Sequence, residues 1–341
     1  MNLCRILEKP SYGFQKNETF YKPSNREIWR EFFSRINFLK SEKNWIGFFS
    51  WFTSLILALP LVIFFIYFFS FKLLIAGFLY GMVGLGSFGT FWYHRYATHK
   101  AFTFRNSCAR NICRNLFIKA IPDEVYVLSH HVHHQICEKP GDPYNVHGGW
   151  LYCFLADVNH QGLNKNLDFK NYALCCKLMA HTGVKANSFE KYQKWGTVCH
   201  PAFTFLHYAL NWTFWYAVFY FIGGNALATA LFGAAGIWSV GVRTYNFEGH
   251  GKGKDLKRAG IDFNLKDFSI NRMWPGLVAG EWHNNHHLFP TGARSGFLKH
   301  QLDLPWFGIR ILHKLGVVSS FKDYKRDFIA FRSAQNIQLR R

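Results

Sequence analysis

Three groups of histidines have the spacing of metal ligands. The motif H-x-x-H-H occurs twice, and a further pair lies upstream: His130, His133 and His134 in "SHHVHHQ", His283, His286 and His287 in "EWHNNHHLFP", and His94 and His99 in "YHRYATHKAF". Residues at i, i+3 and i+4 lie on one helical face, so each triplet presents three imidazoles to one point or to two adjacent points. The sequence therefore predicts a metal site.

The elements that must position these histidines include long uncharged segments. No Asp, Glu, Lys or Arg occurs in residues 45–71, 73–93 or 195–242, and about 20 apolar residues cross a hydrocarbon layer as a helix. The third segment is long enough for two helices, with a turn favoured at Gly223, Gly224 and Asn225. We therefore predict an all-α integral membrane protein with four transmembrane helices in two hairpins.

The distribution of positive charge predicts the orientation. The chain has 40 Lys and Arg against 20 Asp and Glu, but only Lys72 lies near a connection on the far side. By the positive-inside rule, both termini and all histidine motifs are cytosolic, in a bacterial inner membrane or the endoplasmic reticulum. The same rule accounts for the net charge of +20. No nucleic-acid partner is expected, because no zinc-finger or RNA-binding signature is present.

We predict one domain over residues 1–341, with a cytosolic helical cap holding a di-metal site. The predicted parts are a cytosolic N-terminal segment (1–44), a first hairpin (45–93), the cap (94–199), a second hairpin (200–242), and a second cytosolic segment that completes the cap (243–341). The histidine groups can meet only if the cap folds over the cytosolic ends of the helices.

The glycine motif at 84–89 and the cysteines are given structural interpretations and not functional ones. Gly84, Gly86 and Gly89 spell G-x-G-x-x-G, but no strand precedes them, so dinucleotide binding is not expected. With Gly77 and Gly81 they favour a small-residue face for close helix packing. The eight cysteines show no C-x-x-C spacing and are expected to be reduced thiols.

The number of histidines indicates more than one metal ion. A single zinc ion takes four ligands, whereas eight converging histidines would saturate two ions. Imidazole also binds iron, copper and nickel. Two redox metals beside a hydrocarbon layer favour oxygen chemistry on a lipid chain, because breaking an unactivated C–H bond needs an oxidant stronger than any side chain. We therefore expect two iron ions.

The three motifs resemble the histidine boxes of the integral-membrane fatty acyl desaturases, most closely the delta-9 acyl-CoA type. The matching segments are "HRYATH", "HHVHH", and "GEWHNNHHLFP" followed by "ARSGF". The resemblance covers roughly residues 75–320. It includes "DPYN" at 142–145, where Tyr144 replaces a histidine of the family, and "LPWFGIRILHKLGVV" at 304–318.

The resemblance implies a ninth histidine ligand just after the fourth span, with an asparagine four residues earlier that holds a metal-bound water. Here "YNFEGH" supplies Asn246 and His250. By this resemblance, one iron would be bound by His94, His134, His250 and His283, with Asn246 through water. The other would be bound by His99, His130, His133, His286 and His287.

Two charged residues beside the boxes have open roles. Glu281, two residues before His283, could orient a ligand imidazole or could be a solvated surface residue. Arg95, next to His94, could contact a phosphate group or form a structural ion pair.

The resemblance implies oxygen-dependent desaturation of a long-chain saturated acyl group linked to CoA, a carrier protein or a glycerolipid. No haem or flavin segment is present, so a ferredoxin or small cytochrome with its reductase is expected to deliver electrons at the basic face. Hydroxylases, ketolases and alkane monooxygenases of the same superfamily share these ligands and stay an alternative. A non-enzymatic metal transporter or sensor is a remote alternative, because it predicts ligands inside the spans.

Overall fold

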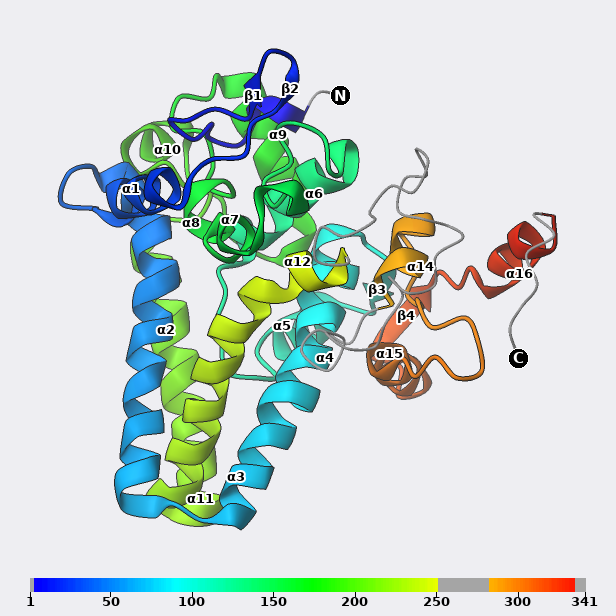
Figure 1. Ribbon diagram of the computed structural model, residues 1–341. Helices are drawn as coiled ribbons and strands as arrows, with labels where there is room; N and C mark the ends of the chain where they lie inside the picture. The colour runs from blue at the N-terminus through cyan, green and yellow to red at the C-terminus, as the bar shows by residue number, and fades with distance from the viewer. Residues whose placement is uncertain (1–2, 251–281, 335–341) are drawn as a thin grey trace.

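The computed structural model describes residues 3–250 and 282–334, and this part of the chain is mostly helical (Figure 1). Its α-helices are α1 (Asn25–Ile36), α2 (Trp45–Ile63), α3 (Phe71–Phe78), α4 (Gly86–Gly89), α5 (Ser107–Arg114), α6 (Asp123–Ile136), α7 (Trp150–Phe154), α8 (Ala156–Asn159), α9 (Phe169–Met179), α10 (Phe189–Trp195), α11 (Pro201–Gly241), α12 (Tyr245–Gly249), α14 (His283–Leu288), α15 (Leu304–Lys314) and α16 (Lys325–Ala334). π-Helical segments at Phe64–Phe68, Leu79–Leu85 and Thr90–Thr98 extend α2, α3 and α4.

The described residues also contain two short antiparallel strand pairs. Strand β1 (Gln15–Lys16) pairs with β2 (Thr19–Phe20), and β3 (Phe102–Phe104) pairs with β4 (Val318–Phe321). The all-α prediction missed both pairs, because strands of two to four residues are too short to show an alternating pattern. The β3–β4 pair joins the chain just after the first histidine box to the chain well after the third.

Three helical segments of the described chain are long and apolar enough to cross a membrane: Glu42–Phe68, Phe71–Thr98 and Pro201–Gly249. The third contains α11, whose backbone leaves the helical conformation at Gly223 and Gly224, with φ at +65° for Gly224. This break coincides with the predicted turn. Figure 1 shows the two limbs of α11 beside α2 and α3, meeting at the end of the bundle far from the cap.

Small residues bring the apolar helices close together. A Cβ atom added at Gly77 would lie 3.3 Å from the carbonyl oxygen of Ala230, and one at Gly81 would lie 3.1 Å from that of Ala234. On the other side of α11, a Cβ at Gly236 would lie 2.8 Å from the carbonyl oxygen of Leu57. The close-packing role predicted for Gly77 and Gly81 is therefore confirmed.

Helix α6 is the central helix of the cap. Its first turn contains Asp123 and Glu124, where negative charge favours a helix N-terminus. One side of α6 packs through Val127, Leu128 and Val132 into a core with α9 and α10. This packing fixes the helix that carries the second histidine box.

Candidate metal centre

The first histidine box lies on a π-helical stretch. Phe71–Thr98 is one continuous helical run, and its last part, Thr90–Thr98, is π-helical. The backbone N–H of His99 donates to the carbonyl oxygen of His94 at 3.2 Å, the i to i+5 bond that defines this helix type. Residues five apart are therefore one turn apart, and the two imidazole centroids lie 5.1 Å from each other.

The nine predicted histidine ligands form two adjacent groups. The five-histidine cluster consists of His94, His99, His130, His134 and His286. The four-histidine cluster consists of His133, His250, His283 and His287. In each cluster, one potential ligand atom from every residue lies within 4.8 Å of the others. The structure thus brings all nine together, but in a different grouping from the one that the desaturase resemblance implied.

Four imidazoles of the five-histidine cluster meet at their Nε2 atoms. Nε2 of His94 lies 2.8 Å from the Nε2 atoms of both His130 and His286. Nε2 of His134 lies 3.1 Å from that of His130 and 3.0 Å from that of His286. Nitrogens at these separations can surround a point about 2 Å from each, which is the length of a metal–imidazole bond. The ring of His99 lies 4.5 Å from that of His134.

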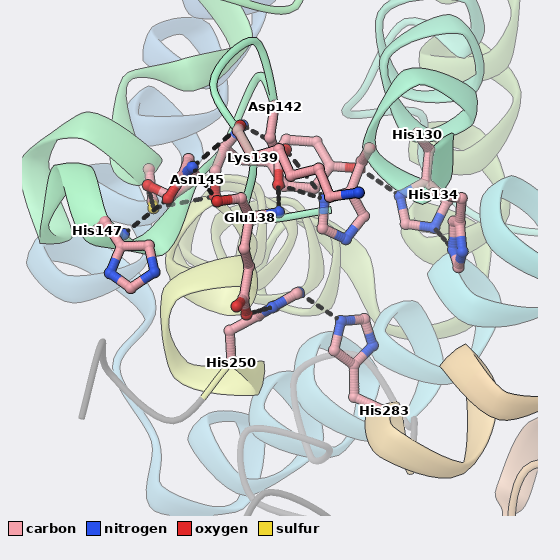
Figure 2. Close-up of polar contacts among 12 residues, drawn as sticks. His130, His134, Glu138, Lys139, Asp142, Asn145, His147, His250 and His283 are labelled. Atoms are coloured by element: carbon pink, nitrogen blue, oxygen red, sulfur yellow. Dashed lines mark hydrogen bonds and ion pairs between the residues drawn. The ribbon is translucent and has the colours of Figure 1, made fainter. Parts of the chain in front are cut away.

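Two carboxylates contact the outer nitrogens of the four-histidine cluster. Both carboxylate oxygens of Asp142 lie 3.0 Å from Nδ1 of His133, and Oε1 of Glu138 lies 2.9 Å from Nδ1 of His250. Figure 2 shows the Glu138 side chain reaching toward His250. When an imidazole donates from Nδ1, its Nε2 lone pair is available to a metal.

Two tyrosines make the corresponding contact to other histidines. The hydroxyl of Tyr245 lies 3.0 Å from Nδ1 of His283, whose Nε2 is 3.0 Å from Nε2 of His250. The hydroxyl of Tyr144 contacts Nδ1 of His130 in the five-histidine cluster. Tyr144, which departs from the family pattern, therefore lies against a predicted ligand.

The chemistry of these side chains fits a metal ion. Burial, followed by the charges of neighbouring imidazoles, lowers the pKa of six histidines well below its usual value: His99, His130, His133, His283, His286 and His287. They are therefore neutral, which is the form that binds metals. The Nε2 atoms of His99 and His133 are buried and have no hydrogen-bonding partner among the described residues, as expected for ligand atoms.

A buried ion pair positions the segment after the third box. The guanidinium of Arg95 lies 2.9 Å from Asp303 and donates to the carbonyl oxygen of Ala293 at 2.6 Å and to the hydroxyl of Ser295 at 2.9 Å. Asp303 in turn accepts the backbone N–H groups of Ser295 and Gly296 at 2.8 and 2.9 Å. Arg95 therefore forms the structural ion pair, and these contacts explain the "ARSGF" segment.

The remaining candidates have different outcomes. Asn246 is half-buried in α12 and lines a cavity that also touches His94. Glu281 lies outside the described residues. Two further groups of potential ligands, His133 with Cys137 and Asp142, and Cys137 with Glu138 and His250, overlap the four-histidine cluster. The seven cysteines with described side chains form no disulfide.

The sequence reasoning missed the residues that contact the outer nitrogens of the predicted ligands. Asp142 was identified only as the first residue of the "DPYN" resemblance, and neither it nor Glu138 was given a role. The two lie eight and four residues after His134, so acidic residues closely following a histidine triplet were the available signal. Tyr245 directly precedes Asn246 and carried no signal of its own. Each contact depends on a turn that the sequence pattern does not specify.

The chain is similar to plant desaturases. It is 27% identical over 256 residues to an icosanoyl-CoA 5-desaturase of Limnanthes douglasii, covering 73% of this chain and 64% of the relative. It is 25% identical to a chloroplastic palmitoyl-monogalactosyldiacylglycerol delta-7 desaturase of Arabidopsis thaliana (71% and 59% covered), and 27% identical to the delta-9 desaturase-like 2 protein of that species (68% and 71% covered).

The matches thus span less than two thirds of the length of the first two relatives. No protein-family profile and no solved structure matches the chain. The similarities confirm the resemblance to the desaturase family that the histidine motifs indicated. Together with the three apolar helices, they support a membrane protein.

Proposed function

We propose that this relative of the desaturases is an integral-membrane fatty acyl desaturase, which uses dioxygen and two iron ions to introduce a cis double bond into a long-chain saturated acyl group. The observation that carries the proposal is the convergence of nine histidines from distant segments in two adjacent clusters. When bound, an iron pair supplies the oxidant needed to remove hydrogen from an unactivated methylene group.

We assign one iron to each histidine cluster. Asn246 is the proposed ligand through water, because it lines the cavity beside His94, and Glu281 is retained as a proposed orienting carboxylate. The histidines and the residues that hold their outer nitrogens fix the imidazole positions before substrate arrives. Such pre-organisation of the first shell lowers the cost of reaching the reactive geometry.

The same cavity is the proposed place of the reacting part of the acyl chain. Its walls include Tyr93, Ile121 and Trp238, and it reaches both His94 and Asn246. The apolar part of its lining would exclude water from the chain and hold it beside His94. The distance between the bound headgroup and the metal ions would then determine which carbons react.

The proposed topology is four spans in one domain, with both termini and the metal centre cytosolic. The break of α11 at Gly223 and Gly224 supports dividing the third apolar segment into two spans. The scarcity of positive charge between the spans supports the orientation, in a bacterial inner membrane or the endoplasmic reticulum. A ferredoxin or small cytochrome would dock on the basic cytosolic face.

We propose a delta-9 position and an acyl-CoA substrate. The relatives named above include enzymes acting on an acyl-CoA and on a galactolipid, so the linkage is a question for experiment. The chain should be expressed in a desaturase-deficient host, followed by gas chromatography of fatty acids from the acyl-CoA and glycerolipid fractions. We expect monounsaturated chains with the double bond at carbon 9, appearing first on acyl-CoA.

The outcome of this experiment separates the rival functions. Hydroxylated or ketone-containing chains without new double bonds would reject desaturation in favour of the histidine-box hydroxylases or ketolases. An unchanged fatty acid profile from a protein that changes cellular metal content would favour a transporter. The variant His147→Ala serves as a control for histidine substitutions and should keep wild-type activity, because His147 is exposed and lies outside both clusters.

A further inference from the structure

One short turn after α6 reaches ligands of both clusters. We define the ligand brace as residues 138–145. Its side chains contact three predicted ligands at their Nδ1 atoms: Glu138 contacts His250, Asp142 contacts His133, and Tyr144 contacts His130. Figure 2 shows this turn between the second box and His250. A single local structure thus acts on histidines from two distant parts of the chain.

The ligand brace is held by its own hydrogen bonds. Asp142 accepts the backbone N–H of Glu138 at 2.7 Å and that of Tyr144 at 3.2 Å. The side-chain amide of Asn145 donates to the carbonyl oxygens of Glu138 at 2.8 Å and Lys139 at 3.1 Å. Glu138 has a left-handed backbone with φ at +59°, a conformation that is unfavourable for a residue other than glycine. The surrounding bonds compensate for that unfavourable conformation.

The two carboxylates of the ligand brace are buried. Glu138 is 5% exposed and Asp142 is 0% exposed. A buried carboxylate needs hydrogen-bond donors or a nearby positive charge, and a metal ion held by His133 or His250 would supply such a charge. A carboxylate that accepts from Nδ1 also fixes the ring and increases the basicity of its ligand nitrogen. Nε2 of His133 is buried and without a partner among the described residues, so this nitrogen is available.

We propose that the ligand brace is a positioning device in which Asp142 and Glu138 set the affinity of the four-histidine cluster for its metal ion. This inference rests on the proposed metal centre. Tyr144 has the corresponding role toward the five-histidine cluster. The brace therefore allows the two metal positions to be perturbed one at a time.

The test compares Asp142→Asn, Glu138→Gln and Tyr144→Phe in the full-length purified protein. Asn and Gln keep an acceptor oxygen but remove the charge, and Phe keeps the ring but removes the hydroxyl. Iron per chain is measured by mass spectrometry, and the environment of each iron by Mössbauer spectroscopy after loading with ⁵⁷Fe. The two carboxylate variants should weaken iron binding at one position by about 10- to 100-fold and leave the other signal unchanged. Tyr144→Phe should alter the signal of the iron in the five-histidine cluster, because Tyr144 contacts His130.

Asn159→Ala controls for a general loss of stability. Asn159 is buried in α8, donates to the carbonyl oxygen of Ile28 at 3.0 Å, and belongs to neither cluster. This variant should be less stable but should retain both iron signals.

The possible failures are distinguishable. If the wild-type protein binds no iron, the proposed function itself is wrong. If the wild type binds two irons but all three brace variants keep its iron affinity and spectrum, the metal centre stands and the ligand brace does not. Equal loss of both irons in Asp142→Asn would likewise overturn the proposal that Asp142 acts only on the metal ion of the four-histidine cluster.

Discussion

Helices α6 and α14 carry the same H-x-x-H-H motif but distribute it in opposite ways. In α6, the i and i+4 residues His130 and His134 join the five-histidine cluster, and the i+3 residue His133 joins the other. In α14, the i+3 residue His286 joins the five-histidine cluster, and His283 and His287 join the other. Helical spacing thus supplies a pair of ligands to one cluster and a single ligand to its neighbour. Which cluster receives the pair depends on how the two helices face each other.

The two helices also differ in what supports them. Helix α6 has 14 residues and is anchored in the cap core by Val127, Leu128 and Val132. Helix α14 has six residues and is held through polar contacts, such as those from Asn285 to Ser295 and Gln301. Burial of apolar side chains positions the first helix, whereas hydrogen bonds and the proposed metal position the second.

The largest expected effect comes from removing His286, the single predicted ligand that α14 contributes to the five-histidine cluster. In His286→Ala, the contacts to His94 and His134 are lost, and desaturation should fall by more than about 100-fold. Product formation by gas chromatography measures this, with His147→Ala as the control. Normal desaturation by His286→Ala would remove this histidine from the ligand set.

The next largest effect is expected from metal removal, which should change the hydrogen exchange of α14 much more than that of α6. After chelation, we expect hydrogen exchange of the α14 amides to accelerate strongly, because this helix has few contacts of its own. The α6 amides should change little, since its core contacts do not involve metal. Exchange measured by mass spectrometry before and after chelation tests this. Equal loosening of α6 and α14 would show that their supports do not differ.

Substitution of Asn285, which anchors α14 through polar contacts, should have a moderate effect on stability and iron binding. Asn285 is buried and donates to the carbonyl oxygen of Ser295 at 2.7 Å and to the side-chain oxygen of Gln301 at 2.9 Å. Asn285→Ala removes this donor from the carbonyl oxygen of Ser295, whereas the side-chain oxygen of Gln301 keeps the backbone N–H groups of Phe297 and Leu298. The variant should cost about 1–2 kcal/mol of stability. The same variant should also bind iron more weakly, because α14 is less well positioned. Thermal unfolding and iron titration measure the two effects, and unchanged values for both would contradict the role of this anchor.

The smallest effect concerns the N-terminal end of α6. Burial raises the pKa of Glu124 from 4.5 to about 7, and its carboxylate accepts the backbone N–H of Cys199 at 2.9 Å. The folded state therefore retains this proton more strongly than the unfolded state, so the wild type loses stability as the pH rises from about 4.5 to 7.

Glu124→Gln removes this titration while keeping an acceptor for Cys199. We expect its unfolding midpoint to lie several degrees above that of the wild type at pH 8, and to match it near pH 4.5. Midpoints measured across this range test the prediction. An advantage that does not depend on pH would show that Glu124 is not the group that titrates.

The sequence was sufficient where the signal is local. Apolar length predicted the three long apolar helical segments, glycine chemistry predicted the break at Gly223 and Gly224, and helical spacing predicted that each histidine triplet would face one point or two adjacent points. The partition of the triplets could not be predicted, because it depends on how α6 and α14 face each other. The π-helical turn that aligns His94 with His99 was also missed, since no residue pattern distinguishes it from an α-helix.

Pairing between segments far apart in the sequence could not be predicted either. Strands β3 and β4 join Thr103 to Ser320, and nothing in either short segment identifies its partner. The contacts of Glu138 and Asp142 required the conformation of the turn after α6, including a left-handed backbone at a glutamate. Such a conformation is specified by the surrounding hydrogen bonds and not by residue type.

The distance along the chain between His94 and His286, 192 residues, has a consequence for biosynthesis. At roughly 5–20 residues per second, about 10–40 s pass between the emergence of these two histidines from the ribosome. On the proposed topology, the first hairpin would therefore enter the bilayer before His250, His283, His286 and His287 are translated. Loading of the proposed metal centre would then follow synthesis of the third histidine box, and if the metal is iron, as proposed, newly made protein in an iron-starved cell would accumulate as an inserted but immature precursor.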